Sequence, residues 1–111
     1  MLKAKMAESV VELSDREFDD FTKEEIVLVD FYADWCMPCV MMEPVIEELS
    51  RKFKDKIKFG RINVDDNQEL AKKFRIMSIP NFVLLKEGEV IEQFVGSRPI
   101  EEFEEKLKKH L

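Results

Sequence analysis

The sequence predicts an α/β fold in which a mixed central sheet of about five strands is flanked on both faces by about four helices. Short apolar runs typical of strands alternate with helix-like periodic segments along the chain, and the last two runs are separated by a tight turn. The predicted order β-α-β-α-β-α-β-β-α begins with parallel crossover units and ends with an antiparallel hairpin. Helices must therefore cover both faces of the sheet.

A short strand and a short helix begin the predicted fold. Residues 10–13, which are apolar except for Glu12, are typical of a short strand. Ser14 and Glu17 fit a capping box, with the hydroxyl at the N-cap and the carboxylate three residues further on. The helix that this box opens turns Phe18 and Phe21 inward.

A buried strand and a long helix follow. Residues 26–32 are apolar on both sides except at Asp30, which indicates a central strand covered on both faces. Beyond the cysteines, apolar residues step by four, three and four and so share one helical face. These residues are Met42, Ile46, Leu49 and Phe53. We expect the six methionines, including the pair Met41 and Met42, to fill the space between helix and sheet.

The next four elements are read from the same periodicities. Residues 57–64 are expected to form a strand and residues 67–74 a short helix. Two further strands at 81–85 and 90–95 flank a hairpin turn, in which Gly88 supplies a positive φ.

The last helix is expected to begin at Pro99, a residue suited to the first helical turn. Its glutamates come early and its lysines late, which matches the helix dipole. The predicted inward face consists of Ile100, Phe103, Leu107 and Leu111. His110 lies beside lysines in the last turn, so we expect it to be solvated.

Length and charge narrow the classes of function. The 111 residues are expected to form one domain, 1–111, with residues 1–8 as a loosely ordered N-terminal extension. A net charge of −6 argues against nucleic acid as a partner. No run approaches the roughly 20 apolar residues of a membrane helix, and the apolar region of a signal peptide is missing. We therefore expect a cytoplasmic monomer that does not bind membranes.

The two cysteines, Cys36 and Cys39, lie between the buried strand and the long helix. A thiolate at a helix N-terminus is favoured by unpaired backbone N–H groups and by the helix dipole. Two intervening residues let Cys39 come within one turn of Cys36 and close a disulfide. Pro38 fits here, because no intrahelical hydrogen bond is lost early in a helix. This arrangement suits attack by Cys36 on a substrate disulfide and resolution of the mixed disulfide by Cys39.

Two other interpretations of the cysteine pair stay open at this point. A structural zinc site needs four ligands, but the sequence has no second cysteine pair and a single histidine at its far end. Two inert core cysteines are the other alternative, although the mouth of a helix is not a natural place for them. Both alternatives are weaker than a redox pair.

From about Val10 onward, the chain resembles the thioredoxin family in the order and spacing of its motifs. The matching segments are 29–39 with Pro44, 76–82, 86–89 and 95–96. Cys-x-x-Cys alone is a weak signal, but it is strong together with a tryptophan, a buried aspartate and an Ile-Pro loop. The resemblance implies a thioredoxin fold.

The resemblance also implies a role for each residue of the site. Cys36 would be the exposed nucleophile and Cys39 the more buried resolving thiol, with Pro38 between them in the catalytic motif. Asp30 would be the buried carboxylate that manages the proton of Cys39, although a core carboxylate without a catalytic role is the alternative. A cis bond before the proline of the Ile-Pro loop is expected. The substrate would dock on Trp35, Met37, Ile79, Pro80 and Gly96.

The implied activity is thiol–disulfide exchange that reduces protein disulfides without a bound cofactor or metal. A thioredoxin reductase or an equivalent electron donor would restore the dithiol, and disulfide-containing proteins would be the substrates. Within the same chemistry, a glutaredoxin-like or disulfide-isomerase-like oxidoreductase is the alternative. A non-catalytic binding module is the alternative from a different class.

Three positions depart from the family pattern. Met37 replaces the usual glycine, and Ser78 stands where a glycine is common. Arg61 occupies the position of a lysine near the buried aspartate, and an arginine cannot give up its proton. Burial raises the pKa of Asp30 whereas a nearby positive charge lowers it, and the sequence does not decide which effect is larger.

Overall fold

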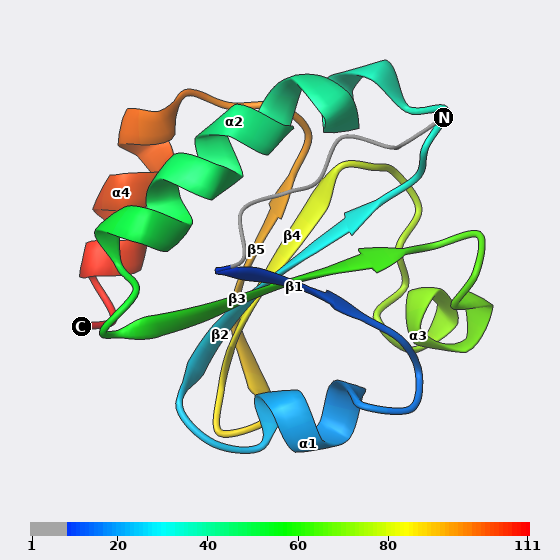
Figure 1. Ribbon diagram of the computed structural model, residues 1–111, viewed down its shortest axis with the longest axis horizontal. Coiled ribbons are helices and arrows are strands. Elements are labelled where there is room, and N and C mark those ends of the chain that lie inside the picture. Colours follow the sequence, from blue (N-terminus) through cyan, green and yellow to red (C-terminus); the bar gives the residue numbers. More distant parts are fainter. Residues whose placement is uncertain (1–8) are drawn as a thin grey trace.

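Within residues 9–111, which the computed structural model describes, a five-stranded mixed sheet forms the centre of the fold (Figure 1). The extension expected at residues 1–8 lies outside the described residues. The strands are β1 (Val10–Leu13), β2 (Ile26–Tyr32), β3 (Ile57–Asn63), β4 (Asn81–Lys86) and β5 (Glu89–Val95). The helices are α1 (Phe18–Thr22), α2 (Met37–Lys52), α3 (Gln68–Lys73) and α4 (Ile100–Lys108).

The sheet order is β1-β3-β2-β4-β5. Strands β1 and β2 both pair with β3 in parallel, whereas β4 runs antiparallel to β2 and β5 antiparallel to β4. The predicted mixed sheet with a closing hairpin is therefore confirmed. In that hairpin, Gly88 has a φ of +87°, and Glu87 also adopts a positive φ of +51°.

Two helices cover each face of the sheet (Figure 1). Buried side chains of α2 and α4 pack against one face, where Phe103 meets Phe82 and Phe94 edge-on. Phe18 of α1 and Leu70 of α3 pack against the other face. This arrangement confirms the prediction that helices lie on both sides.

Strand β2 is buried on both faces because it lies in the middle of this sandwich. Alternate side chains of a strand point to opposite faces. Asp30 therefore shares its face with Leu28, which belongs to the core under α2 and α4, and with Tyr32, which packs beside the two cysteines. This places Asp30 below the first turns of α2.

One row of register partners crosses all five strands at the level of Asp30. The row consists of Glu12, Arg61, Asp30, Phe82 and Phe94. The two members on β4 and β5 are apolar, whereas the three members on β1, β3 and β2 have ionisable side chains.

The capping-box prediction was wrong about where α1 begins. The backbone N–H and the hydroxyl of Ser14 donate to the Glu17 carboxylate at 3.1 and 2.6 Å. Helix α1 begins only at Phe18, with Glu17 at the N-cap. The two side chains bind each other and close a turn before the helix instead of capping it. The other predicted strands and α3 lie within one residue of the observed boundaries.

Two expectations for the C-terminal residues were also wrong. Leu111 is exposed because α4 ends at Lys108, before the inward face reaches Leu111. His110 is partly buried, and its Nε2 lies 3.2 Å from a carboxylate oxygen of Glu92 on β5. The packing of α4 beside β5 brings these two side chains together.

The methionine prediction holds for Met42, a residue of α2 whose side chain is buried in the core between the helix and the sheet. Met41, Met37 and Met77 are exposed, and the remaining two methionines lie outside the described residues. Met41 differs from Met42 by one position, which turns its side chain by about 100° around the helix and out of the core.

Candidate active site

Helix α2 begins directly beyond the carboxyl end of the central strand. Cys36 is its N-cap, with an extended backbone at φ −89° and ψ 103°, and Met37 is the first helical residue. Pro38 occupies the first turn, where its missing N–H costs no intrahelical hydrogen bond. The sequence prediction for the position of the cysteines is therefore confirmed.

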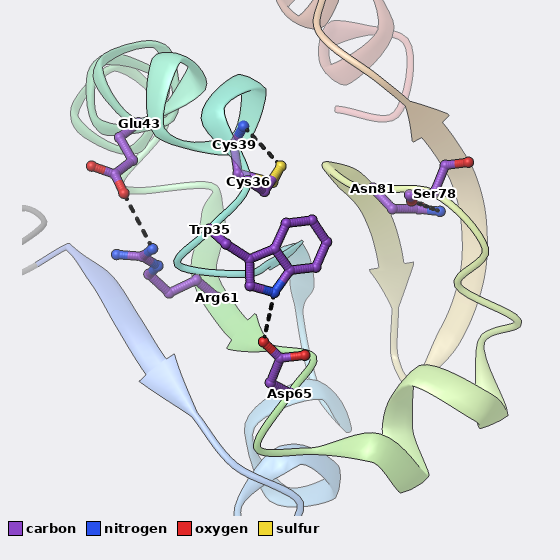
Figure 2. The surroundings of a disulfide bond; sticks show 8 residues. All are labelled: Trp35, Cys36, Cys39, Glu43, Arg61, Asp65, Ser78 and Asn81. Atoms are coloured by element: carbon purple, nitrogen blue, oxygen red, sulfur yellow. Dashed lines mark hydrogen bonds and ion pairs between the residues drawn. A yellow bond between two sulfur atoms is a disulfide. The ribbon is translucent and has the colours of Figure 1, made fainter.

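Cys36 and Cys39 are joined by a disulfide, and their Cα atoms lie 5.3 Å apart. The backbone N–H of Cys39 donates to Sγ of Cys36 at 3.2 Å, as Figure 2 shows. A sulfur at this N-cap therefore receives a hydrogen bond and faces the positive end of the α2 dipole. Both interactions favour a negative charge on Cys36 in the reduced form.

Exposure does not distinguish the two cysteines. Cys36 is 4% exposed and Cys39 is 3% exposed, so the expectation that Cys36 is the exposed member of the pair is wrong for the disulfide form. The disulfide ties Cys36 back over the first turn of α2, where Tyr32 and Ile79 belong to the same apolar cluster. The difference between the cysteines lies in the backbone, because Cys36 caps the helix and Cys39 lies within it.

The Ile79–Pro80 peptide bond is cis, as the family resemblance implied. Ile79 packs against the cysteine cluster, and the Pro80 carbonyl accepts the Gly96 N–H at 2.8 Å. The structure therefore brings these three predicted docking residues together with the disulfide. Pro80 itself is buried and adds little exposed surface. Ser78, the departure in this loop, is exposed, and its carbonyl accepts a hydrogen bond from Asn81 at 3.4 Å (Figure 2).

Two exposed apolar side chains, Trp35 and Met37, adjoin Cys36 in the sequence. Trp35 is 71% exposed and Met37 is 65% exposed. The indole N–H of Trp35 donates to the Asp65 carboxylate at 2.9 Å (Figure 2). Asp65 was missed by the sequence analysis, because nothing distinguishes it from the other acidic residues until the loop after β3 is placed beside Trp35.

Asp30 is 2% exposed, and its Oδ1 has no hydrogen-bond partner. Burial raises the pKa of this carboxyl group from 3.8 to about 7. The positive charge of Arg61 opposes the rise, whereas Glu43 and Glu12 add to it. Burial therefore has a larger effect on the pKa of Asp30 than the positive charge of Arg61, which the sequence alone did not decide.

The guanidinium of Arg61 pairs with two carboxylates. Its Nη2 lies 3.4 Å from Glu43 on α2, and its Nε lies 3.6 Å from Glu12 on β1. The guanidinium also stacks over the ring of Tyr32, with its Cζ 3.7 Å from the ring centroid. The Tyr32 hydroxyl in turn donates to Glu12 at 2.8 Å, and burial raises the pKa of this phenol.

Sequence reasoning missed Glu12, Glu43 and Tyr32. Glu43 follows Cys39 by four residues, so helical spacing places both on one side of α2 and was an available signal. Glu12 carried no such signal, because its link to Arg61 depends on the register between β1 and β3. Within residues 9–111, the structure contains no group of three or more metal-ligating side chains. No helix in that range is long and apolar enough to cross a membrane.

A redox-active cysteine pair at a helix N-terminus, an adjoining cis-proline loop and a buried carboxyl group define a thiol–disulfide oxidoreductase. The comparisons agree. A sequence model of the thioredoxin family matches residues 9–109. Thioredoxin from Bacillus subtilis is 48% identical over 103 residues, covering 93% of this chain and 99% of that protein. Thioredoxin from Staphylococcus saprophyticus is 41% identical over the same length and coverage.

The structural comparison points the same way. A solved chain from work on the thiol-resolving mechanism of yeast mitochondrial 1-Cys peroxiredoxin via the glutathione and thioredoxin systems superimposes with a TM-score of 0.84. It is 30% identical, and the match covers 95% of this chain and 99% of that one. The chain belongs to the thioredoxin family and has the thioredoxin fold. Its activity is protein-disulfide reduction, and the relatives favour this activity over the glutaredoxin-like, isomerase-like and non-catalytic alternatives.

Proposed function

We propose that Cys36 is the nucleophile of this disulfide reductase and Cys39 the resolving thiol. The observation that carries the assignment is the hydrogen bond from the Cys39 N–H to Sγ of Cys36 at the N-terminus of α2. Such a bond stabilises negative charge on Cys36, and the thiolate is the form that attacks a disulfide. Pro38 supports the geometry, because it allows the helix to begin between the two cysteines.

The first step forms one disulfide and breaks another. The Cys36 thiolate attacks one sulfur of the substrate disulfide, forming a mixed disulfide and releasing the other substrate sulfur as a thiolate. Cys39 then loses its proton and attacks Sγ of Cys36. This forms the Cys36–Cys39 disulfide and releases the second substrate thiolate. Two electrons have moved from the cysteine pair to the substrate.

Asp30 is proposed to accept the Cys39 proton in the second step. Its carboxyl group is buried on the face of β2 that α2 covers, and its Oδ1 is without a hydrogen-bond partner. A pKa of about 7 suits a group that takes and gives a proton near neutral pH. The proton then passes to a released substrate thiolate or to water.

The substrate is proposed to dock on the apolar residues around the disulfide. The proposed docking surface comprises Trp35, Met37, Ile79, Pro80 and Gly96. Trp35 and Met37 provide exposed apolar area beside the buried sulfurs, and Ile79 belongs to their cluster. A protein disulfide approaching Cys36 must pass over this surface.

The electron donor is proposed to be a thioredoxin reductase or an equivalent donor that reduces the same disulfide. The protein is further proposed to be a single domain over residues 1–111 that acts as a monomer in the cytoplasm. The bacterial thioredoxins that the chain resembles support this setting. Neither a metal nor a cofactor enters the proposed reaction, because the cysteine pair itself holds the electrons.

Trapping experiments test the division of labour. A Cys39→Ser variant should accumulate a mixed disulfide with a protein that has one accessible disulfide, since no resolving thiol remains. A Cys36→Ser variant should accumulate none. Mass spectrometry of the products under non-reducing conditions reads both results, and trapping by the Cys36→Ser variant alone would reverse the assignment.

A further inference from the structure

The Asp30 carboxyl group lies beside a guanidinium that pairs with other acids. Asp30 and Arg61 are register partners on β2 and β3. Within the described residues, the ion pairs of Arg61 go to Glu12 and Glu43, while Oδ1 of Asp30 has no hydrogen-bond partner. A nearby positive charge favours the ionised form of a buried carboxyl group, so whatever directs the Arg61 guanidinium to other acids also affects the acidity of Asp30.

Three elements hold the guanidinium of Arg61 in place. Glu12 approaches from β1, Glu43 from α2, and the Tyr32 ring lies under the guanidinium from β2. The Tyr32 hydroxyl also donates to Glu12, which keeps that carboxylate beside Arg61. Figure 2 shows the Arg61 side chain directed toward Glu43. Only 11% of the Arg61 side chain is exposed, so these contacts determine its direction.

We propose that Glu43 is a positioning residue which, with Glu12, holds the Arg61 guanidinium away from Asp30 and thereby sets the acidity of the buried carboxyl group. The inference rests on the proposed function, in which Asp30 takes the proton of Cys39. Glu43 is suited to this task because it lies on the same helix as Cys39, one turn further on. The helix that carries the resolving thiol thus also carries the residue that controls its proton acceptor.

Charges of both signs act on Asp30: Arg61 lowers its pKa, whereas Glu43 and Glu12 raise it. The charged groups that act on it are Arg61 on β3, Glu12 on β1 and Glu43 on α2, and Tyr32 shares its face of β2. On β4 the register partner is a phenylalanine and adds no charge.

Neutralising Glu43 acts on Asp30 in two ways. It removes a negative charge that raises the pKa of Asp30, and it frees Arg61 to turn toward the carboxylate. Both changes stabilise the ionised carboxylate. In general, at an effective dielectric constant of about 20, a charge roughly 10 Å from a titrating group shifts its pKa by about one unit, so two effects in the same direction should exceed that shift.

The direct test is the titration of the Asp30 side-chain carboxyl, followed by carbon-13 NMR in the disulfide form of the whole protein. In Glu43→Gln the midpoint should fall by more than about one pH unit relative to the unmodified protein, because the freed guanidinium adds to the loss of the Glu43 charge. Glu48→Gln is the matched control, since this exposed residue of α2 undergoes the same change of charge. An unchanged midpoint in Glu43→Gln, or an equal fall in the control, would overturn the proposal.

A second background separates positioning from the direct charge of Glu43. In an Arg61→Met protein no guanidinium is left to release, so adding Glu43→Gln should lower the midpoint only through the lost charge, and by less than it does in the unmodified protein. An equal fall in both backgrounds would show that Glu43 acts by its charge alone and would overturn the positioning role. Arg61→Gln serves the same purpose if the methionine variant does not fold.

The pH profile of mixed-disulfide resolution distinguishes this inference from the proposed function. If both are right, the acid limb of that profile moves down in Glu43→Gln by the same amount as the NMR midpoint. A lowered midpoint with an unchanged profile supports the positioning role and refutes the proposed role of Asp30. An unchanged midpoint refutes the positioning role whatever the profile does.

Discussion

The backbone N–H of Cys39 points at Sγ of Cys36 and lies 3.2 Å from it, so the two redox residues are linked by a helix cap as well as by a disulfide. The two residues are about equally buried. We therefore expect selectivity between the thiols of the reduced protein to come from this hydrogen bond and the α2 dipole.

Alkylation of the reduced protein tests this conclusion. With limiting iodoacetamide, Cys36 should be modified first, and its reaction midpoint should lie below the free-thiol reference of about pH 8.5. Peptide mapping by mass spectrometry locates the modified residue. First modification of Cys39 would contradict the prediction. A thermally unfolded sample is the control, because both cysteines should then react at similar rates.

The stability of the protein should respond to pH through Asp30. Its pKa is about 7 in the folded state and 3.8 in the reference state. Between these values the folded state keeps the proton that the unfolded state has lost, so stability is full below about pH 4 and falls as pH rises toward 7. Asp30→Asn removes this loss. A difference of about three pKa units corresponds to at most about 4 kcal/mol.

Urea denaturation at pH 4 and at pH 8 measures this effect. Asp30→Asn should match the unmodified protein at pH 4 and exceed its free energy of unfolding by up to about 4 kcal/mol at pH 8. The exposed Asp55→Asn is the matched control and should show no such pH-dependent gain. The same Asp30→Asn protein should resolve mixed disulfides more slowly at neutral pH. If Asp30→Asn and the unmodified protein had the same free energy of unfolding at both pH values, the prediction would be contradicted, because Asp30 would then ionise as readily in the folded protein as in the unfolded chain.

The elements of this fold could be predicted because they leave periodic patterns in the sequence. The continuous apolar run of β2 and the four-three-four spacing in α2 are local signals, and both elements are found where they were expected. The start of α1 could not be predicted in the same way. Ser14 and Glu17 have the right spacing for a cap, but their side chains bind each other instead.

In the candidate site too, features that depend on residues close in sequence could be predicted, whereas contacts between distant segments could not. Cys36 and Cys39 are close in sequence, so their geometry followed from helix spacing. The neighbours of Asp30 depend on which strands adjoin β2 and in what register, which a single sequence does not show. The place of Glu12 in the site therefore became evident only from the structure. The balance between burial and Arg61 at Asp30 also required the positions of both side chains.

The hydrogen bond between Trp35 and Asp65 predicts a substrate-binding effect. Asp65 is itself fixed by a hydrogen bond from its N–H to the Asn63 side chain at 2.9 Å, so it offers the indole a stable acceptor. Asp65→Ala should raise KM for a protein disulfide about fivefold, the equivalent of about 1 kcal/mol, and leave kcat unchanged.

Two controls accompany this variant. Asp66→Ala changes the same charge at the next exposed residue and should leave KM unchanged. A small aromatic disulfide, which needs little docking surface, should be reduced by Asp65→Ala at the unmodified rate. An equal loss with both substrates would indicate damage to the cysteine pair instead of to docking.

The last prediction concerns Met37, the first residue of α2 and the position where the family usually has glycine. Two effects compete at this position. An apolar side chain excludes water from Cys36 and disfavours its thiolate, whereas a residue with less backbone freedom than glycine keeps Cys36 on the helix cap and favours the thiolate. The Met37 side chain is 65% exposed, so it removes little water from the sulfur. The backbone effect should therefore be the larger one.

Met37→Gly should accordingly raise the reaction midpoint of Cys36 slightly and make the protein more reducing, by no more than about 30 mV or about 1.4 kcal/mol. Equilibration with defined thiol redox buffers gives the potential, and alkylation against pH gives the midpoint. Met37→Ala separates the two effects, because it removes most of the side chain but keeps the restricted backbone. It should behave like the unmodified protein. A lowered midpoint with a less negative potential in Met37→Gly would show instead that exclusion of water dominates at this position.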